Sequence, residues 1–394
     1  MSSESVFKNK NLYIIFGITL IAMMGVASIT PAFPDIIQYF DISPQQVGGL
    51  IVAFTLPGVF LTPFTGILAD RYGRKIVLVP SLFLFGLAGF ACMFTKDFYW
   101  LMVLRFFQGI GASSLSSINI TLVGDLFEGK QRTSVMGYNA SVLSIATASY
   151  PALGGIIAIW GWQYIFALPV LAIPLGLVVI RGLKNPEPAG KMHLRTYFSR
   201  VWKTINQRTV WGLLIVNFIL FIILYGTYLT YFPLMMEKRM GSDSFHIGLM
   251  MSLMSVTTAI MSSQLVRLNR LLGQKRQLII GSLGYFIASI LMLFANDYFS
   301  LALAVIVFGF GHGITIPSIQ NMMVGFAAIN ERAAFMSLNS MVLRGGQTAG
   351  PLLVGTVYAF SGLNATFLSG AVMAVFMLVL VYLMVHIEKP ETKN

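Results

Sequence analysis

The sequence has unusually little charge for its length. Asp, Glu, Lys and Arg make up 10% of its 394 residues, whereas soluble globular proteins carry about 25%. Hydrophobic residues account for 56%, and the mean hydropathy is +0.78. A soluble chain of this composition could not keep so much apolar surface away from water, so the sequence predicts an integral membrane protein.

The sequence also lacks the short motifs of common enzyme classes. It contains no Gly-x-x-x-x-Gly-Lys-Ser/Thr phosphate loop, so ATP is not hydrolysed by this chain, and no His-Glu-x-x-His metal motif. It has no Gly-x-Ser-x-Gly nucleophile motif either. Cys92 is the single cysteine, which excludes an internal disulfide and leaves the redox compartment open. These absences argue against an enzyme, and we expect neither a cofactor nor a metal.

Charge-free apolar runs recur at lengths that can cross a bilayer, which takes about 20 residues. They are residues 11–34, 42–69, 76–95, 209–236, 247–266, 277–296 and 298–330. Two further runs are each long enough for two spans, 133–180, divided at Trp160-Gly161, and 345–387, divided at Ser361-Gly362. Residues 98–122 add a span that holds one arginine. The sequence therefore predicts an all-α fold with twelve transmembrane helices.

The net charge of +12 is distributed unevenly. The predicted outer loops hold only Lys96, Lys238 and Arg239, and nearly all other Lys and Arg residues fall in predicted inner segments. The positive-inside rule then places both termini in the cytoplasm. The basic balance thus reflects topology rather than a nucleic-acid partner. The first apolar run is too long for a signal peptide and has no small-residue cleavage site behind it, so we expect it to be retained as helix 1.

Matching residues recur along the chain at an offset of 200. The stretch from Arg270 to Lys275 occupies the frame of Asp70 to Lys75, and further matches are Gly109-Ile110-Gly111 with Gly309-Phe310-Gly311, Arg132 with Arg332, and Pro151 with Pro351. An internal duplication in so apolar a chain is typical of secondary transporters. It predicts two pseudo-symmetric six-helix bundles, residues 1–183 and 209–394. In the linker, 184–208, apolar residues at helical spacing from Leu194 to Ile205 predict an amphipathic helix on the inner leaflet, and a basic linker without fixed structure is the alternative.

Three motifs resemble those of the major facilitator superfamily. The stretch Gly66-Ile67-Leu68-Ala69-Asp70-Arg71-Tyr72-Gly73-Arg74-Lys75 resembles its signature loop between helices 2 and 3. The sequence from Arg105 to Gly111 resembles its helix-4 motif, and Asp125 with Arg132 resembles the following inner loop. The resemblance covers the whole chain, and it implies a monomeric transporter in which the two halves rock around a central cavity.

The resemblance also implies a latch on the inner side. In the family the arginine equivalent to Arg74 pairs with an acid at the inner end of helix 4, here Asp125. The aspartate, here Asp70, faces the N-terminal end of helix 11, whose partial positive charge favours a carboxylate. As an alternative, the cations of this loop only set topology. The predicted latch residues are Gly66, Asp70, Arg71, Gly73, Arg74 and Asp125.

Arg105 and Arg344 are the only charges deep within predicted spans. Each would cost about 3 kcal/mol or more if it faced lipid, so we expect both to face the central cavity and contact substrate. An arginine satisfied by backbone carbonyls is the alternative. Tyr225 and Tyr228 in helix 7 offer aromatic rings with hydroxyl groups, which suit amphipathic organic substrates. The predicted substrate-binding set is Arg105, Gln108, Asn139, Tyr225, Tyr228, His312 and Arg344.

Few groups could carry a coupling proton. Asp35 lies near the outer end of helix 1, and Glu237 at the outer end of helix 7 is expected near it because these helices are repeat partners. The pair forms either an outer gate or two solvated helix ends. His312, in the middle of helix 10, titrates in a suitable range, and a hydrogen-bonded packing role fits it equally well.

Helices 5 and 11 carry small residues and prolines that resemble the antiporter motif of the drug:proton branch. Such residues allow helices to approach and bend; they are Pro151, Gly154, Gly155, Gly346, Gly350 and Pro351. We therefore predict a transporter of the cytoplasmic membrane that exports a small organic compound in exchange for protons. Scant intramembrane acid favours a neutral or anionic substrate. A proton-coupled uptake symporter is the first alternative, and a non-transporting membrane receptor is the second.

Overall fold

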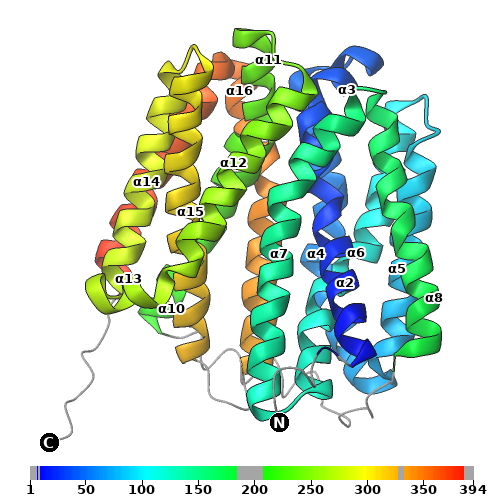
Figure 1. Cartoon of the computed structure of the whole chain (residues 1–394). Helices are drawn as coiled ribbons and strands as arrows, with labels where there is room; N and C mark the ends of the chain where they lie inside the picture. Colours follow the sequence, from blue (N-terminus) through cyan, green and yellow to red (C-terminus); the bar gives the residue numbers. More distant parts are fainter. Residues whose placement is uncertain (1–6, 8, 184–206, 327–331, 386–394) are drawn as a thin grey trace, which may run out of the picture.

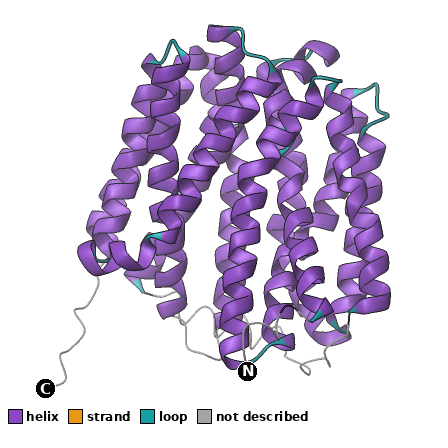
Figure 2. Cartoon of the chain, viewed as in Figure 1, coloured by secondary structure: helices purple, strands orange, loops and turns teal. Residues whose placement is uncertain are grey.

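The computed structural model describes residues 7, 9–183, 207–326 and 332–385. Within these ranges every regular element is a helix (Figure 2). The amphipathic helix predicted between Leu194 and Ile205 lies outside the described residues, as does most of the predicted linker.

The first half of the chain contains six crossings. Its helices are α2 (Lys10–Ala27), η1 (Thr30–Ala32), α3 (Phe33–Phe40), α4 (Pro44–Tyr72), α5 (Arg74–Cys92), α6 (Phe98–Leu126), α7 (Gly129–Ala158), η2 (Trp162–Leu171) and α8 (Ala172–Gly182). Segments α2, η1 and α3 together make the first crossing, and η2 continues into α8 as the sixth.

The second half repeats this arrangement. Its helices are α10 (Arg208–Ile222), η3 (Ile223–Tyr231), α11 (Phe232–Met240), α12 (Ser244–Ser263), α13 (Leu265–Leu272), α14 (Gln274–Phe294), α15 (Tyr298–Phe326) and α16 (Arg332–Met384). Eleven segments are long and apolar enough to span a membrane. The last of them turns back at Gly362, where φ is 75°, so α16 is two crossings. The prediction of twelve helices is confirmed.

Two breaks between helices lie where the sequence analysis predicted them. Gly161, with φ of 138°, separates α7 from η2, and Gly362 separates the two arms of α16. Glycine adopts such positive φ without the steric cost that a Cβ imposes. Gly73 and Gly273 form the equivalent turns of the two halves, with φ of 98° and 75°. These turns end one crossing and start the next.

The crossings form two bundles that stand side by side in Figure 1, α2–α8 at the right and α10–α16 at the left. The first residue of α2, Lys10, and the last of α16, Met384, lie at the same end of the molecule, which we call the terminal side. The opposite end, with α3, α11 and the turns at Gly161 and Gly362, is the far side. The bundles touch mainly where α4 packs on α16 and α7 packs on α12.

Equivalent contacts occur in both bundles. Thr62 donates a hydrogen bond to the carbonyl of Ser113 at 3.1 Å, and Ser262, 200 residues later, donates one to the carbonyl of Gly313 at 3.0 Å. A Cβ added at Gly109 would overlap the carbonyl of Phe54, and one at Gly309 would meet the carbonyl of Met254 at 2.5 Å. The sequence repeat is thus a repeat of helix packing, as the duplication predicts.

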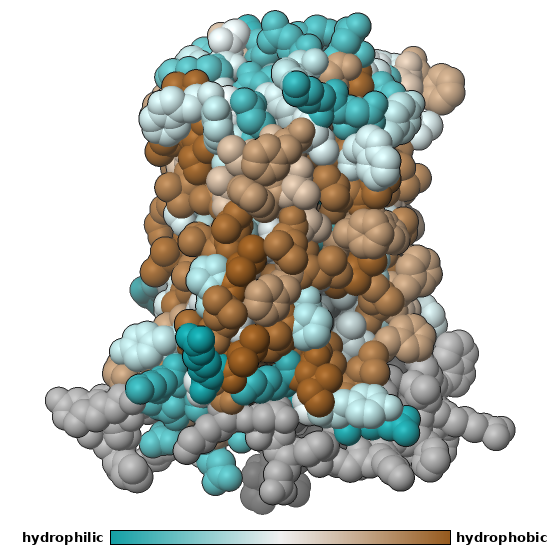
Figure 3. Space-filling view, turned by 90° about the vertical axis from the view of Figure 1, so that its right-hand side faces the viewer, coloured by the Kyte–Doolittle hydropathy of each residue, from teal (hydrophilic) through white to brown (hydrophobic). Residues whose placement is uncertain are grey.

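The outer surface fits a lipid environment. Figure 3 shows a broad belt of hydrophobic residues between hydrophilic ends. Large apolar side chains are openly exposed along the helices, for example Phe60 at 63% and Phe376 at 53%. Exposure of so many large apolar groups is stable only against an apolar solvent. The chain is therefore a multi-pass membrane protein.

Candidate functional site

Arg105 is enclosed within the first bundle. Its side chain is 1% exposed, Nη1 donates to Oε1 of Gln108 at 2.7 Å, and Nε donates to the carbonyl of Leu50 at 3.4 Å. The guanidinium carbon lies 4.4 Å from the ring centre of Phe54, which is cation–π range, and 6.0 Å from that of Phe166. The charge is thus held by a carbonyl, an amide and two aromatic faces of one bundle.

The sequence analysis expected Arg105 to face a cavity between the bundles, and its position differs from that expectation. Its hydrogen-bond and ring partners, and the residues that line the void of about 10 Å³ beside it, belong to the first bundle. Nη2 of Arg105 and Nε2 of Gln108 have no hydrogen-bond partner there. Sequence alone gives the depth of a charge in a span but not the direction in which the helix presents it.

Arg344 lies between the bundles. It projects from the first arm of α16 across Gly58 of α4, and a Cβ at Gly58 would meet its Cδ at 2.6 Å and its Nη1 at 2.7 Å. Arg344 is half-buried, and Gln347, one turn further along α16, is hydrogen-bonded to Tyr225. Arg344 therefore lies where the two bundles meet, and its predicted role in substrate binding stays a prediction.

Polar groups from three helices surround Arg344. Nε2 of Gln347 donates to the hydroxyl of Tyr225 at 3.0 Å, and the hydroxyls of Thr55 and Thr348 lie 2.9 Å apart across the bundle interface. The sequence analysis predicted Tyr225 but missed Gly58, Gln347, Thr55 and Thr348. Gln347 lies within the helix-11 motif, which was the one available signal for it.

Tyr228 and His312 lie inside the second bundle. The ring of Tyr228 stacks on Phe308 with centres 4.7 Å apart, and its side chain is 1% exposed. Nδ1 of His312 lies 2.6 Å from the hydroxyl of Tyr285. These contacts hold both residues in an aromatic cluster within the second bundle.

Asn139 holds two helices of the first bundle together. Its Oδ1 accepts a hydrogen bond from Thr19 at 2.5 Å, and the same threonine oxygen accepts one from Asn119 at 2.5 Å. The second bundle has an equivalent bond, from Asn217 to Asn339, 2.8 Å long. Asn139 and Asn339 are 200 residues apart, so this is another contact of the repeat.

The structure brings part of the predicted latch together. Nε of Arg74, at the start of α5, donates to Oδ2 of Asp125, at the end of α6, at 2.9 Å. The guanidinium of Arg71 lies 5.3 Å from the ring centre of Tyr72. A Cβ at Gly66 would meet nothing within 4 Å, and the side chain of Asp70 lies outside the described part of the chain.

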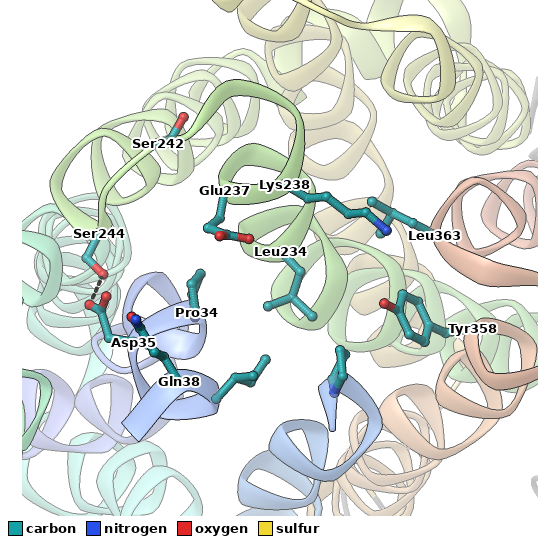
Figure 4. Close-up of a pocket in the computed structure, with 12 residues that line it drawn as sticks. Pro34, Asp35, Gln38, Leu234, Glu237, Lys238, Ser242, Ser244, Tyr358 and Leu363 are labelled. Atoms are coloured by element: carbon teal, nitrogen blue, oxygen red, sulfur yellow. Dashed lines mark hydrogen bonds between the residues drawn. The ribbon is translucent and has the colours of Figure 1, made fainter. Parts of the chain in front are cut away.

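The far side holds a pocket of about 320 Å³ between the bundles (Figure 4). Asp35 and Glu237 both line it, which confirms their predicted proximity. Oδ2 of Asp35 lies 2.6 Å from the hydroxyl of Ser244, so α3 of one bundle is hydrogen-bonded to α12 of the other. Its other polar lining residues are Gln38, Lys238, Ser242 and Tyr358.

The predicted small residues lie at close helix contacts. A Cβ on Gly248 would overlap the carbonyl of Pro151, and one on Gly48 would meet Cβ of Pro351 at 3.1 Å. These two contacts join the bundles and are related by the offset of 200. Gly155 also packs across the interface, on the backbone of Ser244, whereas the other three pack within their own bundles, namely Gly154, Gly346 and Gly350.

Hydrogen bonds between the bundles gather toward the far side. Thr30 lies 3.8 Å from the sulfur of Met251, the backbone N–H of Ala152 donates to Ser252 at 3.0 Å, and Ser244 reaches both Pro31 and Asp35. The Thr55–Thr348 contact lies nearer the middle of the molecule. Helices α7 and α12 approach at the far side and diverge toward the terminal side in Figure 1. The far side is therefore closed.

Two symmetry-related bundles, closed on one side and carrying a polar interface within the membrane, define the class of secondary transporters. The chain belongs to the Major Facilitator Superfamily, whose family model matches residues 15–262 and 236–394. It is a secondary transporter and not an enzyme.

Known proteins resemble the chain over most of its length. The quinolone resistance protein NorA of Staphylococcus aureus strain COL is 24% identical over 361 residues, which cover 89% of this chain and 90% of NorA. A multi-drug resistance efflux pump PmrA homolog of Lactococcus lactis is 24% identical over 374 residues, 92% of each chain. The solved structure of a bacterial homolog of the human lysosomal transporter Spinster, inward-facing and unoccupied, superposes with a TM-score of 0.80 at 15% identity and 98% coverage of both chains.

Proposed function

We propose that the protein exports small organic compounds in exchange for protons by alternating access. The observation that carries this proposal is the pair of symmetry-related contacts, Gly248 on Pro151 and Gly48 on Pro351, which close the far side through both bundles at once. If the bundles rock apart there, both contacts are released together. The relatives named for quinolone resistance and multidrug efflux support export as the direction.

The charge distribution supports an orientation with the terminal side in the cytoplasm. Cations that border the terminal side include Lys75, Arg181 and Lys275, whereas Lys96 and Lys238 are the lysines toward the far side. Lysine and arginine are enriched in cytoplasmic segments. Both termini would then be cytoplasmic in the cell membrane, and the closed far side would face outward. The working unit would be a monomer of two bundles, residues 1–183 and 209–394, whose partners are its substrate, protons and lipid.

Asp35 is our candidate for the coupling proton. The hydroxyl of Ser244 lies 3.0 Å from the carbonyl of Pro31 and 2.6 Å from Oδ2 of Asp35, but it has only one proton to donate. If Ser244 donates its proton to the carbonyl of Pro31, its oxygen can only accept a hydrogen bond from Asp35. Asp35 can donate that bond only when its carboxyl group is protonated. Proton binding at Asp35 would then stabilise the closed far side. The other charged groups nearby are Glu237, Lys238 and Asp243.

Everted membrane vesicles with an imposed pH gradient test this proposal. Antiport predicts that adding a transported compound dissipates the gradient, read by a pH-sensitive dye, and that Asp35→Asn abolishes the response. Asp41→Asn is the matched control, because Asp41 is an exposed far-side carboxylate at φ of 50°, a conformation that asparagine also tolerates. A full response in Asp35→Asn would eliminate Asp35 as the coupling group. Further acidification of the vesicle lumen when the compound is added would favour an uptake symporter.

A further inference from the structure

Arg344 carries a positive charge on the bundle interface without an acidic partner among the described residues. The ion pairs between described residues, Arg74 with Asp125 and His246 with Asp243, lie elsewhere. A charge inside the membrane is kept where a counter-charge or water can reach it. Arg344 is half-buried rather than sealed, so such a group can reach it.

The groups around Arg344 add to its preference for negative charge. Because the hydroxyl of Tyr225 accepts a hydrogen bond from Gln347, its own O–H remains able to donate. The missing side chain at Gly58 leaves room for the guanidinium between α4 and α16. A guanidinium and a phenolic O–H on neighbouring helices of one interface are two donors suited to one carboxylate.

Aromatic surface adjoins these donors. The ring of Phe221 lies 6.1 Å from that of Tyr225, and a Cβ at Gly345 would meet the ring of Phe218 at 3.3 Å. An aromatic wall beside a charged donor matches a ligand with an apolar ring and an anionic head.

We propose that Arg344 and Tyr225 bind the carboxylate of an aromatic organic anion, and that this anion is a transported substrate. The claim that the anion binds rests on the local geometry, whereas the claim that it is transported rests on the proposed function. Arg105 is not an equivalent site, because Gln108, Leu50 and Phe54 of its own bundle already hold its guanidinium. Arg344 is packed against the opposite bundle, so a ligand there contacts both.

Binding to the purified full chain in phosphatidylcholine nanodiscs tests the proposal. The probes are 1-naphthoate, 1-naphthamide and 1-naphthylmethylammonium, which share a ring system and differ in charge. We expect 1-naphthoate to bind at least about tenfold more tightly than the other two, since a charge-assisted hydrogen bond accounts for such a factor. Arg344→Gln should remove this preference, and Arg181→Gln, which changes an exposed terminal-side arginine, should retain it.

A second variant covers the case in which Arg344→Gln does not fold. Gly58→Ala keeps every charge but places a methyl group against Cδ and Nη1 of Arg344, so it should weaken 1-naphthoate binding while leaving that of 1-naphthamide unchanged. Equal affinities for the three probes, or a carboxylate preference that survives Arg344→Gln, would overturn the proposal.

Two further comparisons distinguish a lipid headgroup from a transported anion, and the anion site from the proposed antiport. If an anionic lipid headgroup occupied Arg344, adding phosphatidylglycerol would displace 1-naphthoate from the wild type, and the assignment to a transported anion would be overturned. If Arg344 binds 1-naphthoate but no compound dissipates a pH gradient, the proposed antiport fails while the binding site stands. If neutral compounds dissipate the gradient and 1-naphthoate does not bind, only the anion site fails.

Discussion

Replacing Gly248 by alanine should open the far side. The added methyl group would overlap the carbonyl oxygen of Pro151 and lie 3.3 Å from Cα of Ala152. Both are backbone atoms of α7 and cannot rotate away, so the two helices must separate. Overpacking of this kind costs about 1–3 kcal/mol. Because the contact joins different bundles, the cost falls only on the state in which the far side is closed.

A cost of about 1–3 kcal/mol shifts the ratio of closed to open far side by about 5- to 150-fold. Spin labels attached after Lys96→Cys and Asn296→Cys report this ratio as a distance distribution. Both positions are exposed on far-side turns, one in each bundle and 200 residues apart. The native Cys92 is buried and should not react. We expect Gly248→Ala to move the main population to longer distances.

The structure supplies graded controls for this variant. Gly48→Ala would bring a Cβ only to 3.1 Å from Cβ of Pro351, compared with 2.4 Å from the carbonyl oxygen of Pro151 for Gly248→Ala, so its effect should be smaller. Gly137→Ala, on α7, meets nothing within 4 Å and should not change the distribution. If Gly248→Ala and Gly137→Ala gave the same distances, the far-side contacts would not control closure.

Two other predictions concern the helix ends. Asp125→Asn removes the charge that pairs with Arg74 at 2.9 Å, and because Asp125 is partly exposed we expect a loss of about 1 kcal/mol, seen as a lower thermal midpoint; an unchanged midpoint would count against the pair. Asp243→Ala removes the side chain that caps α12 by accepting from the N–H of His246 at 2.9 Å, which should cost about 1 kcal/mol. That backbone N–H lowers the pKa of Asp243 below its ordinary 3.8, so the stabilisation is present at neutral pH and is lost only as pH falls through the lowered value. Thermal midpoints of wild type and variant should therefore converge in acid, and a constant gap would refute the cap.

The sequence predicted the fold closely because both of its signals are local. A charge-free run of spanning length must be a helix in lipid, since no other open structure satisfies its backbone there. The breaks at Gly161 and Gly362 were readable because positive φ favours glycine. The offset of 200 marked the repeat directly, and packing contacts such as Thr62–Ser113 and Ser262–Gly313 follow it.

The candidate site was less accessible to sequence analysis. In the sequence, Arg105 and Arg344 look alike, because each is a single charge within a predicted span. In the structure Arg105 is enclosed by its own bundle, whereas Arg344 lies on the interface. A helix that is apolar on all sides gives no periodic signal for the face it presents. Gly58 shows the same limit, because its role is to leave space for a side chain from the other bundle, which its own helix cannot reveal.

The most direct test of the account compares distances on both sides of the membrane in the same protein. A second label pair, from Ile76→Cys and Arg276→Cys, sits at exposed positions of α5 and α14 near the terminal side, again 200 residues apart. Alternating access predicts that conditions which lengthen the 96–296 distance, such as high pH or Gly248→Ala, shorten the 76–276 distance. Distances that stay fixed, or that lengthen on both sides together, would contradict the claim that the two bundles open one side by closing the other.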